Sequence, residues 1–295
     1  MSLQRPSGGA APVFPKLGFY PGFLTRSVLL EAIFSETTIR LSIFLGVLAL
    51  MIGWEYYKPK RKPRYSRKQR WPANLGIVAI DTVAVRLLVP AGLIGAAFYA
   101  EQAGWGLFNN LDVPSWAAVV VSIIGLDIAI YWQHRAFHRF PVLWRLHRVH
   151  HADPDFDVTT GLRFHPFEIL LSLGIKAGAV VLLGAPVLAV IIFEVILNAC
   201  SLFNHGNVAL PPKAERWVRK ILITQELHRI HHSSLKHETN SNYGFSVSWW
   251  DHLFNSFTAK PKAGSDNVDI GLTEYREAKL TTRLWGLLKI PFSNR

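Results

Sequence analysis

The sequence has little cysteine and little charge. Of its 295 residues one is cysteine, Cys200, and 18% are charged, whereas 50% are hydrophobic. One thiol excludes a disulfide framework, a cysteine-ligated zinc finger and an iron–sulfur cluster held by this chain alone. Any metal chemistry must therefore use nitrogen and oxygen ligands. The hydrophobic excess predicts a membrane protein, because several stretches approach the ~20 apolar residues needed to cross a bilayer.

Acidic residues are also scarce, and the formal net charge is +12. Eight basic residues and no acid lie between Lys58 and Arg70, between an apolar segment that ends in Trp54 and another that begins near Ala73. A basic loop beside a membrane span is typical of the cytoplasmic side and attracts anionic lipid headgroups. Nucleic-acid binding is the alternative explanation, but the aromatic residues form no stacking pattern around this run. We therefore expect no nucleic-acid partner.

Histidine, by contrast, is present in an unusual pattern. Eight of the twelve histidines fall into three short clusters, one H-x-x-x-H and two H-x-x-H-H. Residues at i, i+3 and i+4 share one face of a helix, so each cluster predicts a patch of imidazoles. Neutral imidazole is a favoured ligand of iron and zinc, and eight ligands are too many for one ion. The clusters therefore predict two metal ions in one site, held by His134, His138, His147, His150, His151, His228, His231 and His232.

The order of apolar and polar stretches predicts an all-α fold. We expect a polytopic membrane helical bundle whose cytosolic-side helical cap carries the histidine-rich dimetal site. The predicted spans are Ile39–Trp54, Asn74–Ala100 and Ser115–Trp132, with the Glu101–Pro114 loop on the far side. The predicted segments are an N-terminal segment 1–38, in which Phe19 to Phe34 could form an interfacial helix, spans in 39–133, two histidine boxes in 134–166, a membrane hairpin in 167–203, a third box and cytosolic cap in 204–260, and a C-terminal segment 261–295.

Two features of this topology matter for the site. Gly184-Ala185-Pro186 interrupts the apolar hairpin, which either crosses the membrane twice or enters and returns. On either reading, all clustered histidines fall on the same face of the membrane as the basic Lys58–Arg70 loop.

The flanks of the histidine clusters carry a family pattern. The motifs are Asp127-x-x-x-Tyr131-Trp132-x-His134-Arg135-x-x-His138, the two H-x-x-H-H boxes, Arg163-x-His165-Pro166-x-Glu168, Asn204-His205-x-Asn207, Glu238-Thr-Asn-Ser-Asn242-Tyr243-Gly244 and Trp249-Trp250-Asp251-x-Leu253-Phe254. In order and spacing, the chain from about Asp127 to Phe257 resembles the fatty acid hydroxylase/sterol desaturase superfamily of integral-membrane di-iron oxygenases. Three departures are Asn240 where aspartate is common, Asn255-Ser256 where Gly-Thr is common, and His252 where arginine is common.

This resemblance implies an O₂-dependent oxidation of a lipid C–H bond by two iron ions at the cytosolic face of a membrane. Hydroxylation and desaturation of a fatty acyl, sterol or related lipid both stay open. Zinc can replace iron in isolated protein, since it outranks Fe²⁺ for nitrogen ligands. The chain has no haem-, flavin- or ferredoxin-like segment, so electrons must come from a separate donor protein. We expect a bacterial inner membrane rather than the endoplasmic reticulum.

The resemblance also adds residues to the candidate site. His205 joins the ligand set, with a supporting role equally open, and for His165 we favour a supporting or substrate contact. Residues expected to support the ligands rather than bind metal are Asp127, Tyr131, His165, Asn204, Asn207 and Asn242. Asp127, Tyr131, His134 and His138 share one helical stripe, so we expect Asp127 to orient His134 or a neighbouring ligand. The alternative for Asp127 is an ion pair with Arg86 of the preceding span.

Two other classes of function were weighed against this one. A membrane zinc hydrolase is the first, but the sequence has no H-E-x-x-H and hydrolysis needs fewer than eight ligands. A non-enzymatic metal transporter is the second, but its ligands would lie inside the spans along a pathway, whereas these lie outside the apolar segments.

Overall fold

The computed structural model describes residues 26–294, and within them the chain is helical. Two isolated antiparallel bridges, Leu222 with Val247 and Ser233 with Ile270, are its extended pairings. The elements are α1 Arg26–Tyr57, α2 Arg67–Leu88, α3 Gly92–Ala103, η1 Leu107–Asn109, α4 Ser115–Arg139, α5 Pro141–His151, η2 Thr160–Leu162, α6 Pro166–Leu183, α7 Val187–Asn204, α8 Pro212–Val218, α9 Gln225–His231, α10 Lys236–Thr239, α11 Trp249–Leu253, α12 Ala278–Thr281, α13 Leu284–Lys289 and η3 Ile290–Phe292.

Five of these helical stretches are long and apolar enough to cross a membrane: Thr37–Tyr57, Arg67–Asn109, Ser115–Arg139, Pro166–Leu183 and Val187–Asn204. The second stretch contains α2, α3 and η1, with the helix interrupted at Pro90. The predicted all-α polytopic bundle is therefore confirmed. The interfacial helix proposed for Phe19 to Phe34 lies partly outside the described residues, and its part from Arg26 onward belongs to α1.

The predicted break between the last two spans is a tight helical turn. Gly184 adopts the left-handed conformation (φ 61°) that ends α6, and Pro186 precedes α7. Each helix has 18 residues, which corresponds to about 27 Å. The turn lies against the loop after α3, because a Cβ on Gly184 would come within 2.9 Å of Asn109 Nδ2. The hairpin therefore runs to the end of the bundle opposite the histidines, which favours two full crossings.

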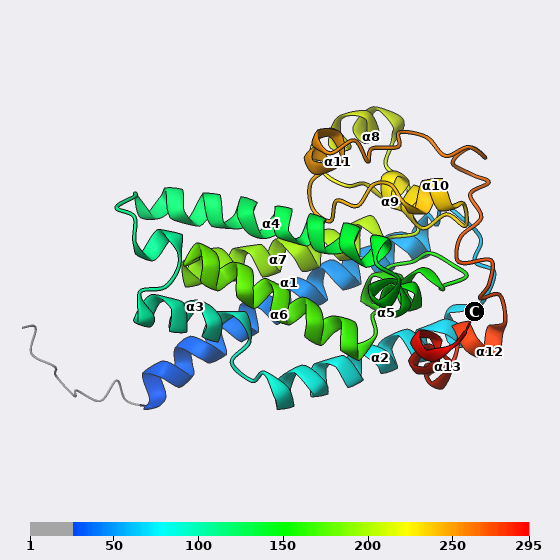
Figure 1. Cartoon of the computed structure of the whole chain (residues 1–295). Coiled ribbons are helices and arrows are strands. Elements are labelled where there is room, and N and C mark those ends of the chain that lie inside the picture. Colours follow the sequence, from blue (N-terminus) through cyan, green and yellow to red (C-terminus); the bar gives the residue numbers. More distant parts are fainter. Residues whose placement is uncertain (1–25, 295) are drawn as a thin grey trace, which may run out of the picture. The chain divides into compact units, whose positions relative to one another are not determined.

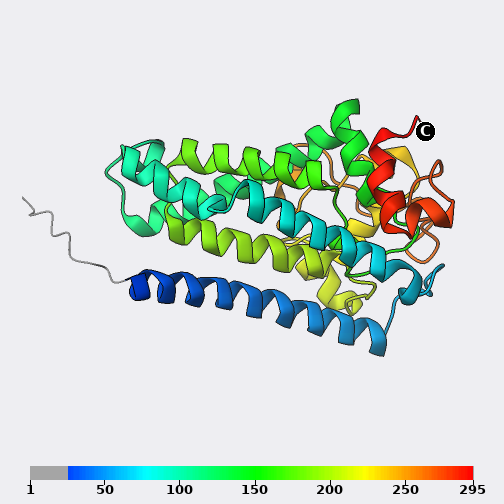
Figure 2. The same ribbon diagram turned by 90° about the horizontal axis from the view of Figure 1, so that it is seen from below.

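The histidine-bearing elements gather at the other end of the bundle. Figure 1 shows α4, α6 and α7 side by side, with α5, α9 and α10 at one end of them and α11 beside α4, and Figure 2 shows α2 alongside the same group. The short helices begin at ordinary start signals, Pro141 at the first turn of α5 and Thr224, whose hydroxyl accepts from Leu227 N–H, before α9. This end of the bundle therefore receives every histidine cluster.

The basic Lys58–Arg70 segment is bound to the protein more closely than its sequence suggested. Arg70 is fully buried and donates to Asp153 (Nη2 to Oδ2, 2.7 Å) and to Asp157 (Nη1 to Oδ2, 2.6 Å). Backbone N–H groups of the segment donate to Asp155 at 2.6 and 2.8 Å. The expectation that this run attracts anionic lipid headgroups is wrong for Arg70, because its buried guanidinium neutralises three buried carboxylates instead. The pairing fixes the loop that follows α5.

Arg70→Met should destabilise the protein by about 3–5 kcal/mol, because it leaves buried carboxylates without their cation. Thermal unfolding of the purified protein in detergent measures the effect. Lys68→Met, an exposed change on the same helix, is the matched control and should leave unfolding almost unchanged. Equal stability of the two variants would contradict a structural role for the Arg70 pairing.

Candidate metal centre

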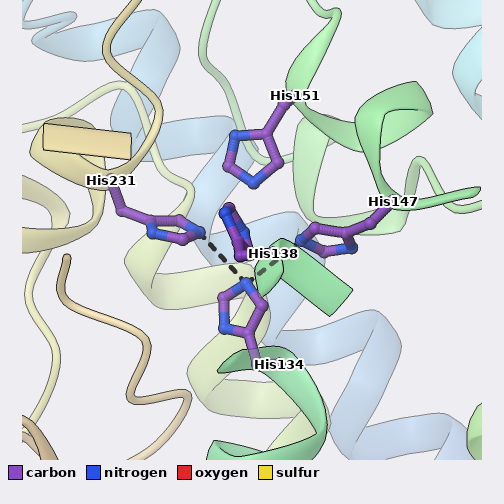
Figure 3. Close-up of side chains that lie close together, drawn as sticks. All are labelled: His134, His138, His147, His151 and His231. Carbon is purple, nitrogen blue, oxygen red and sulfur yellow. Dashed lines mark hydrogen bonds between the residues drawn. The ribbon is translucent and has the colours of Figure 1, made fainter. Parts of the chain in front are cut away.

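Nine histidines converge at this end of the bundle in two adjacent clusters. The potential ligand atoms of each cluster lie within 4.8 Å of one another. The clusters touch, since the rings of His151 and His232 stack at 4.4 Å between centroids. The first cluster is His134, His138, His147, His151 and His231, drawn in Figure 3, and the second is His150, His205, His228 and His232.

Each H-x-x-H-H box supplies both clusters. In α5, His147 and His151 belong to the first cluster while His150 belongs to the second. The box that begins in α9 is divided in the opposite way, with His231 in the first cluster and its other two histidines in the second. Each box therefore contributes imidazoles to both clusters, which is the arrangement that two metal ions would require.

Burial keeps these imidazoles neutral. Burial lowers the pKa of His147 to about 3 and that of His205 to about 4. Burial, together with the neighbouring imidazoles, holds the pKa of the other cluster histidines outside the spans well below the ordinary value: His150, His151, His228, His231 and His232. Neutral imidazole is the form that binds metal, so the site is prepared for ligation at physiological pH.

Three ligands of the first cluster have one ring nitrogen already committed. His134 Nδ1 donates to the carbonyl of Tyr243 at 2.7 Å, and His231 Nδ1 donates to the carbonyl of Ser241 at 2.7 Å. His147 Nδ1 lies 2.6 Å from the Glu168 carboxylate. A carbonyl oxygen can only accept, so the proton of the neutral His134 and His231 rings sits on Nδ1, and pairing with an ionised Glu168 puts the His147 proton there as well. Each Nε2 is then left with a bare lone pair.

Those bare nitrogens point at one another. His134 Nε2 lies 3.1 Å from His147 Nε2 and 3.0 Å from His231 Nε2, along the dashed lines of Figure 3. Two neutral acceptors cannot hydrogen-bond, so the contact is unfavourable unless a cation lies between them. Nitrogen ligands at ~2.1 Å from one ion, at right angles, would lie about 3 Å apart. The donor set therefore fits a metal ion.

The second cluster also brings bare imidazole nitrogens face to face. His205 Nδ1 donates to the Ser201 carbonyl at 2.7 Å, and its Nε2 lies 3.1 Å from His150 Nε2 and 2.9 Å from His228 Nε2. His232 is buried with neither ring nitrogen bonded within the described protein, and the same is true of His151 in the first cluster. Buried polar nitrogens without partners are costly, and a second ion would relieve that cost.

The segment from Ser241 to Gly244, whose carbonyls orient His134 and His231, is held in place by Asp251. Its carboxylate accepts from the N–H groups of Tyr243 and Gly244, both at 2.8 Å. It also accepts from the Ser256 hydroxyl, which in turn lies 2.7 Å from the Tyr131 hydroxyl. Tyr131 therefore acts on His134 indirectly, by fixing the loop whose Tyr243 carbonyl accepts the hydrogen bond from His134 Nδ1.

Two departures from the family pattern keep the local geometry. Asn255 adopts a positive φ of 54°, which asparagine tolerates better than most other side chains. The glycine that is common at this position in the family motif adopts such a φ readily. Ser256 keeps the hydroxyl that a threonine would offer. Asn240 Oδ1 lies 3.3 Å from His138 Nδ1, so the amide keeps an acceptor beside this ligand without the negative charge of aspartate.

Comparison with known proteins decides the family. The fatty acid hydroxylase family model matches residues 119–256, which include all nine histidines. An ornithine lipid hydroxylase of Rhizobium tropici is 30% identical over 261 residues, which cover 86% of this chain and 75% of that protein. The chain belongs to the fatty acid hydroxylase family.

More distant members of the fatty acid hydroxylase family differ in length and in named activity. Alkylglycerol monooxygenase of Danio rerio is 29% identical over 171 residues, 57% of this chain and 36% of that protein. A very-long-chain aldehyde decarbonylase of Oryza sativa subsp. japonica is 24% identical over 184 residues, 56% of this chain and 27% of that protein. The chain thus spans about a third of these two relatives. No solved structure matches it.

Asp127 does not have the partner that the sequence suggested. Its Oδ2 accepts from Trp250 Nε1 at 2.8 Å, while His134 is oriented by a main-chain carbonyl. Among the described residues, no ion pair joins Asp127 to Arg86. Sharing a helical face with His134 does not bring Asp127 into contact with it. Seven residues along the helix separate the two by about 10 Å, which is too far for a hydrogen bond.

The other supporting candidates fix loops around the ligands. Asn204 and Asn207 donate to carbonyls of Phe245 (2.9 Å) and Arg61 (2.8 Å). Asn242, with a positive φ of 50°, donates to the Leu227 carbonyl at 3.0 Å beside the third box. His165 lies outside both clusters, at the N-cap of α6, where Nδ1 accepts from Phe167 N–H at 3.3 Å.

Two residues with direct contacts to ligands had no role assigned from sequence. The Glu168 carboxylate pairs with His147 Nδ1. Its position in the Arg163–Glu168 motif could have identified it from sequence. Gly161 has no such signal, yet a Cβ there would come within 2.9 Å of His205 Nδ1. Only glycine leaves room for the hydrogen bond between His205 and Ser201.

Glu168→Gln should lower metal affinity by about 10- to 100-fold, because it removes the carboxylate that orients and polarises His147. Competition with a graded set of chelators, followed by elemental analysis, measures the affinity. The exposed change Glu274→Gln is the control. Unchanged affinity in a folded Glu168→Gln protein would show that the 2.6 Å contact does not tune the metal centre.

Proposed function

We propose that this protein is a membrane-bound, O₂-dependent oxidoreductase that uses two iron ions to hydroxylate a C–H bond of a lipid. The observation that carries the proposal is the convergence of three bare Nε2 atoms, 3.0 and 3.1 Å apart, beside a second cluster of the same kind. Named hydroxylase and monooxygenase relatives favour hydroxylation over desaturation. A metal transporter is disfavoured, because both clusters lie together at one end of the bundle.

The protein's part in this chemistry is to hold, orient and shield. An unactivated C–H bond offers no acidic proton and no leaving group, so the iron pair would supply the oxidising power through O₂. The first cluster would hold one ion and the second cluster the other. Aromatic rings exclude water around them, with Phe164 stacked on His150 at 4.4 Å and Phe245 5.5 Å from His134.

A lipid can approach the first cluster from within the bundle. A cavity of ≈ 440 Å³ between α1, α2, α4, α6 and α7 is lined by His134 and Glu168. Apolar side chains, among them Phe44, Val85 and Leu197, form much of its remaining wall. This position supports a substrate that enters from the bilayer.

Electrons would arrive from the opposite direction, through a separate donor protein. His138 is the partly exposed member of the first cluster, and with Trp144 it lines a surface recess of ≈ 290 Å³. The Trp144 ring lies 5.0 Å from His138 and 5.4 Å from His151. A donor docked in this recess would lie close to the first cluster through His138 and Trp144.

Elemental analysis of protein expressed with iron should give two metal ions per chain. His231→Ala should lose metal and lipid oxidation, whereas His237→Ala, a side chain 64% exposed and outside both clusters, should lose neither. Lipid mass spectrometry of membranes with and without the gene, under ¹⁸O₂, would detect a product heavier by one labelled oxygen. Metal-loaded protein that consumes no O₂ with any lipid would overturn the proposal.

The clusters are proposed to face the cytoplasm, because the basic Lys58–Arg70 segment lies at the same end of the bundle. A bacterial inner membrane is proposed as well, since the ornithine lipid hydroxylase relative is bacterial. A cysteine placed at Asp112 in a Cys200→Ser background should react with an impermeant thiol reagent only from outside the cytoplasm. A cysteine placed at Lys62 should react only from inside. The reverse pattern would place the clusters on the other face.

A further inference from the structure

The cavity beside His134 has a polar wall that an acyl chain does not need. Along α6, Glu168, Ser172 and Lys176 all line it. They are spaced four residues apart and so form one stripe, about 12 Å long, that leads from the metal centre into the membrane-spanning part of the bundle. Ionisable groups at such depth are costly and mark functional sites by default.

The end of the stripe near His134 offers acceptors without donors. Asp81 and Glu168 are both buried and repel each other electrostatically, and the buried oxygens Asp81 Oδ1 and Glu168 Oε2 have no hydrogen-bond partner in the described protein. Gln133 donates to Ser172 at 2.9 Å, which leaves its own Oε1 unpartnered too. Buried acceptors without donors are costly, so a ligand that donates hydrogen bonds fits here.

The deeper end of the stripe has an excess of cations. Arg40, Arg86 and Lys176 line the cavity, and Arg40 is paired with Glu194 at 2.7 Å. Lys176 makes no hydrogen bond and no ion pair within 4.0 Å in the described part of the chain, and the carboxylate that attracts it, Glu194, is paired with Arg40. On a helix, side chains lean toward the N-terminus, which brings the Lys176 ammonium back toward Ser172 and the site. An anionic ligand group fits at this position.

We infer that this cavity binds the polar headgroup of the lipid, with Asp81 and Glu168 accepting from an ammonium or hydroxyl group beside His134 and Lys176 pairing with an anionic group. The inference rests on the proposed function and narrows its substrate class to lipids with a dipolar headgroup. The oxidised carbon then lies in or next to the headgroup, not far along the alkyl chain.

Binding of defined probes tests this without requiring turnover. The probes are N-palmitoyl-lysine, its ε-acetylated form, its methyl ester, 1-O-hexadecylglycerol and hexadecane, each titrated into purified protein in phosphatidylcholine nanodiscs. We expect acetylation and esterification each to weaken binding by about tenfold or more, because each removes one charged hydrogen bond. Hexadecylglycerol should bind through its hydroxyls and hexadecane should bind weakest.

Variants assign each group to its partner. Asp81→Asn should abolish the preference for the free amine over its acetylated form. Lys176→Met should abolish the preference for the acid over its ester, while Lys176→Arg should keep it. Lys279→Met, an exposed change outside the cavity, is the control. If either variant fails to fold, the blocked probes on the unmodified protein still decide the question.

Equal affinity for all probes would overturn the headgroup inference, and so would a product oxidised far along the alkyl chain. Either result would leave the proposed function standing if the protein still oxidises lipids. Absence of metal and of any lipid oxidation would instead overturn the proposed function, while the probe affinities would still report on the cavity.

Discussion

Neutral imidazoles crowded into a buried space repel one another through their lone pairs unless a cation lies between them. Here the protons are fixed on Nδ1 by Tyr243 and Ser241 carbonyls, and the Nε2 atoms of His134 and His231 face each other at 3.0 Å. Folding therefore places these imidazoles in an arrangement that is unfavourable by itself and that a bound metal ion would stabilise. Most other features of this end of the bundle serve to hold that arrangement in place.

Support for the ligands comes largely from main-chain carbonyls, which are fixed by groups still farther from the metal positions. Asp251 accepts a hydrogen bond from the N–H of Tyr243, whose carbonyl accepts from His134 Nδ1. Ser256 links Asp251 to Tyr131 on α4. On the other side, Arg70 anchors the acidic run after α5 through Asp153 and Asp157. Rotating one imidazole would therefore require moving several elements, which explains how short helices and loops can hold a centre of this accuracy.

The proposed substrate cavity and the proposed docking recess lie on different sides of the first cluster. The apolar bundle supplies a path for the hydrocarbon part of a lipid, while the stripe on α6 supplies polar partners close to the ligands. His138 and Trp144 mark the side away from that cavity, where an electron donor would approach. A lipid substrate and a separate reductant would thus reach the same centre without competing for space.

The sequence by itself determined the helical class, the apolar spans and eight of the nine clustered histidines, because hydropathy and helical spacing are local properties. The ninth, His205, followed from the family resemblance. Even the turn at Gly184 could be predicted, since glycine and proline act on their own backbone. The tertiary structure decided how each box divides between two clusters and which groups orient the ligands. Tyr243 lies 109 residues from His134 and contributes a carbonyl, a group that every residue carries and no motif can reveal. Asp127 is the opposite case. Helical spacing placed it on the same face as His134, but its hydrogen-bond partner is Trp250, 123 residues away. Axial distance along the helix and tertiary packing, rather than a shared helical face, decide which side chains meet.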